Sequence, residues 1–150
     1  MNPFTHVRDT LAAREDKRLL HYMLYDPTSK CGCLMGSVIP EEVRESLKGI
    51  NYVAETVDGT VPACATPAAG RWATSVGLDP YWVIFLQVLN DAQSEENPHQ
   101  RYTRVLGVLN TLAEFDEDEV MGLKRHLGVL TPMIRSHVSR VTDWRKYANW

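Results

Sequence analysis

The sequence contains no long hydrophobic run. Its longest strongly apolar stretch, Tyr81 to Leu89, covers nine residues, which is less than half of the roughly 20 that a helix needs to cross a bilayer. The first ten residues also lack the basic flank and the apolar segment of a secretory signal peptide. We therefore expect no membrane span and a chain that stays in the cytosol.

Cysteine is scarce, and the three residues are Cys31, Cys33 and Cys64. An odd number does not suit a disulfide framework, so we expect reduced thiols. Together with one histidine, the three would supply the four soft ligands of a structural zinc site. The spacing does not match the common zinc motifs, however, and there is no second clustered pair. We interpret the thiols as packing residues and expect neither a metal nor another cofactor.

Catalytic motifs are missing as well. There is no Gly-rich phosphate loop, nucleophile elbow or metalloprotease helix, and no local signature pairs one of the five histidines with a cysteine. Acids such as Asp91, Glu95 and Glu96 can do acid–base work or hold a metal, but solvated acids in a loop are far commoner. The sequence favours a non-enzymatic protein and leaves open an enzyme whose residues meet only in the fold.

The composition is that of an ordinary globular domain. Hydrophobic residues make up 44% of the 150 residues and charged residues 23%, which predicts one domain over residues 1–150 with a core of its own. The net charge of −3 disfavours a surface that is basic all over and built to hold nucleic acid.

Helix starts are the clearest local feature. An N-cap residue followed by proline satisfies one backbone N–H group and fixes the first helical φ. This pair precedes helical apolar spacing at Asn2-Pro3, Thr66-Pro67, Asp79-Pro80, Asn97-Pro98 and Thr131-Pro132. A sixth helix should begin at Asp116, with Glu119 in the capping-box position, and end at Gly128. Glu41 to Leu47 is predicted to form a short linking helix.

The fold class predicted from these elements is mainly α. The Asp79 helix is apolar nearly all round, so other helices must enclose it, and we expect it to be the most buried element. The helices that begin at Asn97 and Thr131 should pack around it. We allow for a small β-hairpin in the N-terminal half, built from Leu19 to Tyr25 and Tyr52 to Val61 (α+β). The expectation is a compact helical domain around a buried central helix.

The C-terminal region has the strongest charge asymmetry. Lys124 to Trp150 holds six lysines or arginines against one acid, whereas Glu114 to Glu119 carries five acids. A basic segment with aromatic residues can bind phosphates and stack on bases, although these cations are spread around the expected helix. The residues that we expect to remain accessible to a partner are Arg135, Arg140, Lys146, Tyr147 and Trp150.

Two short segments, in this order along the chain, read Cys31-Gly32-Cys33-Leu34-Met35-Gly36 and Leu89-Asn90-Asp91. They resemble the Cys-Cys-Leu-Gly and downstream Leu-Asn-Asp segments of a group of small uncharacterised tailed-phage proteins. The resemblance implies a phage accessory protein made in a bacterial cytoplasm, and it brings no assigned activity. The Asn90 and Asp91 pair ends the core helix, where an amide and a carboxylate either cap neighbouring backbone or contact a ligand.

These features favour a non-enzymatic phage accessory protein that acts by binding in the host cytoplasm. It would block a host protein or sequester a nucleotide-like defence ligand. The alternatives are a nucleic-acid-binding protein that uses the basic C-terminal helix and an enzyme assembled only in the fold. No catalytic or metal-binding residue is assigned. The predicted contact residues are Arg135, Arg140, Lys146, Tyr147, Trp150, Asn90 and Asp91.

Overall fold

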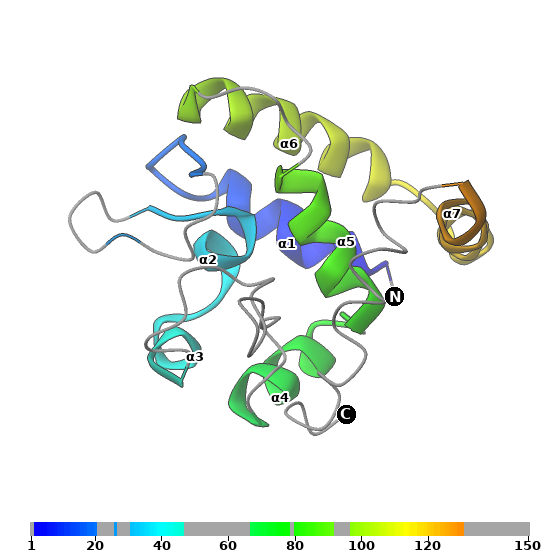
Figure 1. Ribbon diagram of the computed structural model, residues 1–150, viewed down its shortest axis with the longest axis horizontal. Helices are drawn as coiled ribbons and strands as arrows, with labels where there is room; N and C mark the ends of the chain where they lie inside the picture. Colours follow the sequence, from blue (N-terminus) through cyan, green and yellow to red (C-terminus); the bar gives the residue numbers. More distant parts are fainter. Residues whose placement is uncertain are drawn as a thin grey trace.

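Short helices build most of the structure, which is a computed structural model (Figure 1). It describes residues 2–20, 26, 31–46, 67–78, 80–91 and 97–130. Within these ranges the helices are α1 (Pro3–Ala12), α2 (Leu34–Val38), α3 (Glu41–Ser46), α4 (Pro67–Ser75), α5 (Pro80–Asp91), α6 (Pro98–Leu112) and α7 (Glu117–Leu130). The mainly α prediction is confirmed. None of the described helices has the length and apolar character that crossing a membrane requires.

The predicted helix starts are confirmed wherever the structure describes them. The Asn2 side chain accepts a hydrogen bond from the Phe4 N–H group at 2.8 Å, and Asn97 accepts from the N–H groups of the second and third residues of α6. Helices α4 and α5 begin at their prolines, Pro67 and Pro80. The start predicted at Thr131-Pro132 lies outside the described residues.

Helix α7 begins as predicted but ends later. The Asp116 carboxylate accepts from the Glu119 N–H group at 2.8 Å, and the Glu119 carboxylate accepts from the Asp116 N–H group at 3.3 Å, which completes the capping box. The predicted end at Gly128 is wrong, because α7 continues to Leu130. A glycine inside a helix costs only about 1 kcal/mol, and α7 also runs through Gly122.

The short helix α3 was predicted, whereas α2 was not. All five residues of α2 are buried, so this helix and not only α5 occupies the interior. Its N-cap residue, Cys33, makes no side-chain capping bond. Instead, the Asn90 side chain on α5 accepts from the Leu34 N–H group at 3.2 Å, across 56 positions of sequence. A cap supplied from another helix leaves no local pattern in the sequence.

The core forms where α1 meets α2, α5 and α6. The Phe4 ring on α1 contacts Trp82 and Phe85 on α5 edge-on, with ring centroids 4.9 and 5.8 Å apart. Helix α5 contributes several buried hydrophobic side chains to this core, as predicted. Helix α6, however, packs mainly against α1 and only more lightly against α5. The core is therefore shared by α1, α2, α5 and α6 rather than made by α5 alone, and Figure 1 shows these four helices next to one another.

The predicted β-hairpin falls mostly outside the described residues, which include none of Tyr52 to Val61. Nearby, an isolated antiparallel bridge joins Asp26 and Cys31, with the Asp26 N–H group donating to the Cys31 carbonyl at 2.8 Å. The Leu20 N–H group donates to the Gly32 carbonyl at 2.9 Å. These bonds place the chain at Leu20 and Asp26 alongside the cysteine segment.

Candidate binding recess

Most of the contact residues predicted from the sequence lie in the C-terminal segment. Arg135, Arg140, Lys146, Tyr147 and Trp150 all fall beyond the last described residue, Leu130. Their exposure and their role in binding stay predictions. The two remaining predicted contact residues are Asn90 and Asp91, and Asp91 is the last residue of α5.

Asn90 is fully buried and bonds to the backbone of two other segments. Its Oδ1 atom accepts from the Leu34 N–H group, and its Nδ2 atom donates to the Leu20 carbonyl at 3.3 Å. This geometry matches the capping alternative for Asn90. The two segments that carry the phage resemblance are thus in direct contact. Ligand binding by the pair stays a prediction.

Arg101 joins the start of α6 to the end of α5. Only 2% of its surface is exposed, and its Nη1 atom donates to the Asn90 carbonyl at 2.7 Å, a charge-assisted hydrogen bond. Arg101 was not among the residues predicted from the sequence. A signal was present, because Arg101 shares the buried face of α6 with Val105 and Leu109, and a cation on such a face needs a buried partner.

A bidentate ion pair lies beside the cysteine segment. The Arg18 Nε and Nη2 atoms donate to the two Asp16 carboxylate oxygens at 2.8 and 3.1 Å. Hydrogen bonding to Arg18 holds the pKa of Asp16 below its usual value, against a smaller opposing effect of burial, and the Cys31 thiol adds a further hydrogen bond. The Asp16 carboxylate is therefore stabilised in its charged form.

Asp16→Asn is expected to remove a pH-dependent part of the stability. Because folding lowers the pKa of Asp16, its contribution is complete above the unfolded value of about 4 and is lost as the pH falls through the folded pKa. Thermal melts of both proteins between about pH 2 and 7 should show a gap in Tm that narrows below about pH 4. A gap of constant width across this range would contradict the assignment.

The thiols of Cys31 and Cys33 are buried and form no disulfide bond with each other. Among the residues that the structure describes, no three His, Cys, Asp or Glu side chains gather as a metal site, and Cys64 is not among those residues.

We expect purified protein to hold far less than one zinc per chain. Elemental analysis of protein prepared without chelator tests this, and a ratio of one zinc per chain would overturn it.

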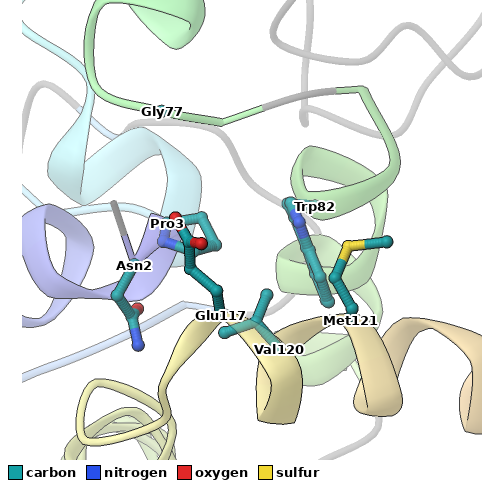
Figure 2. A pocket seen from close by; sticks show the side chains of 7 residues that line it. All are labelled: Asn2, Pro3, Gly77, Trp82, Glu117, Val120 and Met121. Atoms are coloured by element: carbon teal, nitrogen blue, oxygen red, sulfur yellow. The ribbon is translucent and has the colours of Figure 1, made fainter.

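A recess opens where α1, α5 and α7 approach one another (Figure 2). Its volume is about 310 Å³, at the lower end of the range of about 300–1,000 Å³ for ligand sites. The residues that line it are Asn2, Pro3, Gly77, Trp82, Glu117, Val120 and Met121. Gly77 has a φ of 81°, a left-handed conformation that glycine adopts without strain, and this turn directs the chain from α4 to α5.

One side of the recess is apolar. Figure 2 shows the Met121 side chain beside the Trp82 ring, with Val120 at their base. Met121 is 50% exposed, whereas Trp82 is only 4% exposed because its ring packs against Phe4 and Phe85. Met121 is therefore the adaptable, accessible part of this wall, and Trp82 is its rigid backing.

The other side of the recess is acidic. The Glu117 side chain extends toward Pro3 on the far side from Trp82 (Figure 2), and the first turn of α7 also carries Asp118 and Glu119. All three acids are exposed. The Lys124 Nζ atom lies 6.0 Å from the centroid of the Trp82 ring, within the range of a cation–π contact, but Lys124 is not among the residues that line the recess.

The recess was not predicted from the sequence, because its walls come from separate helices. Trp82 belongs to the Asp79 helix that was predicted to be buried, and Glu117 was counted only as one of the five acids from Glu114 to Glu119. Met121 offered a signal, since it lies next to Val120 and about 100° around the helix from it, on a face that is otherwise polar. Within the described ranges, Met121 and Val108 are the large hydrophobic residues that stand exposed.

In comparisons with known proteins, no protein-family model, curated protein sequence or solved structure matches this chain.

Proposed function

We propose that this chain is a non-enzymatic binding protein that acts by blocking another protein. The observation that carries the proposal is the half-exposed Met121 side chain beside Trp82 at a recess of about 310 Å³. An unbranched thioether adapts to the shape of an apolar partner. The Trp82 ring behind it packs against Phe4 and Phe85, so Met121 is supported from the core while its own side chain stays accessible.

The partner in this proposal is a host protein in a bacterial cytoplasm. The support is the resemblance of the Cys31 to Gly36 and Leu89 to Asp91 segments to those of tailed-phage accessory proteins. A small phage protein without catalytic motifs acts most simply by covering a surface that its host uses.

Two features of the recess favour a protein over a nucleotide-like ligand. A base stacks on an open aromatic face, but Trp82 is only 4% exposed. A phosphate would lie near the Glu117 carboxylate, and two like charges repel each other. Sequestration of a nucleotide-like ligand at this recess is therefore the weaker alternative.

The test uses Met121→Asp, with Val108→Asp as its matched control. Both substitutions place a carboxylate at an exposed apolar position, on α7 and α6 respectively, and both should leave Tm nearly unchanged, since surface changes cost within about 0.5 kcal/mol. Tagged proteins are mixed with nuclease-treated bacterial extract, and captured proteins are identified by mass spectrometry. Loss of an interface anchor costs about 2 kcal/mol or more.

We expect the wild type and Val108→Asp to capture the same bacterial protein and Met121→Asp to capture it at least about tenfold less well. Equal capture by all three proteins would contradict the proposal. Capture from a parallel untreated extract that is absent from the nuclease-treated extract would contradict the proposal and point to the basic C-terminal segment and nucleic acid.

A further inference from the structure

The Asn2 side chain makes hydrogen bonds to two distant parts of the chain. Its Oδ1 atom accepts from the Phe4 N–H group at 2.8 Å. Its Nδ2 atom donates to the carbonyls of Leu112 and Phe115 at 2.8 and 2.9 Å, across 110 and 113 positions of sequence. A side-chain amide has two N–H groups, and Asn2 uses both of them on these carbonyls. This one side chain therefore joins the start of α1 to the end of α6.

The cap on α1 requires only the oxygen of Asn2. Asn, Asp and Ser are about equally good N-cap residues, because each offers an oxygen to the first backbone N–H groups of the helix. Of these three residues, only Asn also has N–H groups to donate to a second segment. The bonds to Leu112 and Phe115 are therefore a second role of Asn2, which goes beyond the N-cap predicted from the sequence.

The two carbonyls belong to the turn that leads into α7. Leu112 is the last residue of α6, and Phe115 directly precedes Asp116, whose carboxylate caps α7. The last carbonyls of a helix have no partner of the usual helical kind, and the Asn2 amide supplies a donor from outside α6. Because this turn sets the direction in which α7 leaves α6, its bonds to Asn2 fix the start of α7 relative to α1.

The place of α7 decides where Met121 lies. Of the described hydrophobic side chains on α7, Val120 is buried in the core and Leu123 packs partly against it, whereas Met121 is 50% exposed. Asn2 lines the same recess as Trp82 and Met121 (Figure 2). A shift of α7 relative to α1 would therefore move Met121 away from its place beside the Trp82 ring.

We infer that Asn2 is the positioning residue for Met121. Its oxygen begins α1, and its two N–H groups hold the turn between α6 and α7 so that Met121 lies beside Trp82. The inference rests on the proposed function for the role of Met121 in binding, but the position of Met121 is measured without the partner.

The test compares Asn2→Ser and Asn2→Asp with the same two changes at Asn97. All four variants keep a side-chain oxygen that serves as an N-cap. At residue 97 this is the observed role, because Asn97 accepts from the N–H groups of His99 and Gln100 in its own helix. At residue 2, serine removes the donors to the two distant carbonyls, and aspartate places a negatively charged oxygen against them.

Two measurements on the full chain report the result. The ¹³C-labelled methyl group of Met121 reports its position, because an aromatic ring shifts the resonance of a methyl group beside it. This resonance is assigned from its absence in Met121→Leu, and Met35, which has no exposed surface, serves as the internal reference. Amide hydrogen exchange at Ala113 and Phe115, whose N–H groups bond to carbonyls in the last turn of α6, reports on the turn itself.

We expect the Met121 resonance to move in both Asn2 variants, and further with aspartate than with serine, while the Met35 resonance stays in place. The Ala113 and Phe115 amides should exchange about fivefold faster or more, the effect of losing one net hydrogen bond. Both Asn97 variants should match the wild type in these two measurements. If Asn2 acted only as a cap, its two variants would match the wild type as well, and the inference would be wrong. Loss of the whole fold in both Asn2 variants, measured by circular dichroism, would also contradict it.

Capture of the bacterial protein separates this inference from the proposed function. If the Asn2 variants leave Met121 in place while Met121→Asp still prevents capture, Asn2 has no positioning role and the proposed function stands. If Met121 moves in the Asn2 variants while Met121→Asp captures as well as the wild type, the positioning role stands and the proposed function is overturned.

Discussion

Replacement of Leu86 by alanine is expected to lower the free energy of unfolding by about 2–5 kcal/mol, the usual cost of a cavity at a buried leucine. Leu86 has no exposed surface and lies on α5 within the core that also contains Phe4 and Val83. Since small domains are stable by only about 5–15 kcal/mol, this single change should remove a large part of the stability.

Urea unfolding followed by circular dichroism measures the effect, with Val108→Ala as the control. Val108 is 38% exposed on α6, so its truncation should change the free energy of unfolding by only about 0.5 kcal/mol. Equal unfolding midpoints for the two variants would mean that α5 is not part of the core.

Asn90→Ala is expected to cost about 2–3 kcal/mol and to loosen α2 specifically. The Leu34 N–H group and the Leu20 carbonyl would each lose a side-chain partner, and a buried polar group without a partner costs about 1–3 kcal/mol. Helix α2 is only five residues long, too short to be stable without contacts from the rest of the fold. Loss of its cap should therefore destabilise α2 before it destabilises the other helices.

Amide hydrogen exchange locates this effect. The N–H groups of Ser37 and Ile39, which bond to carbonyls of the α2 segment, should exchange faster in Asn90→Ala, while amides in the middle of α6 change less. Asn97→Ala is the matched control, because Asn97 caps α6 from an exposed position and its loss costs about 1 kcal/mol. If both variants changed α2 exchange equally, Asn90 would have no special role there.

The parts of the fold that local chemistry determines were predictable from the sequence. Asn2 and Asn97 cap helices through their own neighbouring N–H groups, and the capping box at Asp116 and Glu119 closes within four residues. Each of these motifs needs nothing from the rest of the chain. The starts of α1, α6 and α7 followed directly from them.

The parts that depend on contacts between distant segments were not predictable in the same way. Helix α2 receives its cap from Asn90, and Arg101 reaches the carbonyl at the end of α5. The recess exists only because α7 brings Met121 alongside Trp82. From the sequence, Asn90 could be narrowed to capping or ligand contact, but that pattern did not name the partner segment, and Met121 was not among the predicted contact residues.

Met121 should be covered when the protein binds its partner. Oxidation by hydrogen peroxide, with peptide mass spectrometry as the readout, tests it directly, because an exposed methionine is converted to the sulfoxide much faster than a buried one. Met121 is half exposed and Met35 has no exposed surface, so Met35 reports whether the fold stays intact. In the complex with the captured bacterial protein, we predict that Met121 oxidises several-fold more slowly than in the free chain, while Met35 stays protected in both. Oxidation of Met121 at the same rate in the free chain and in the complex would contradict the account.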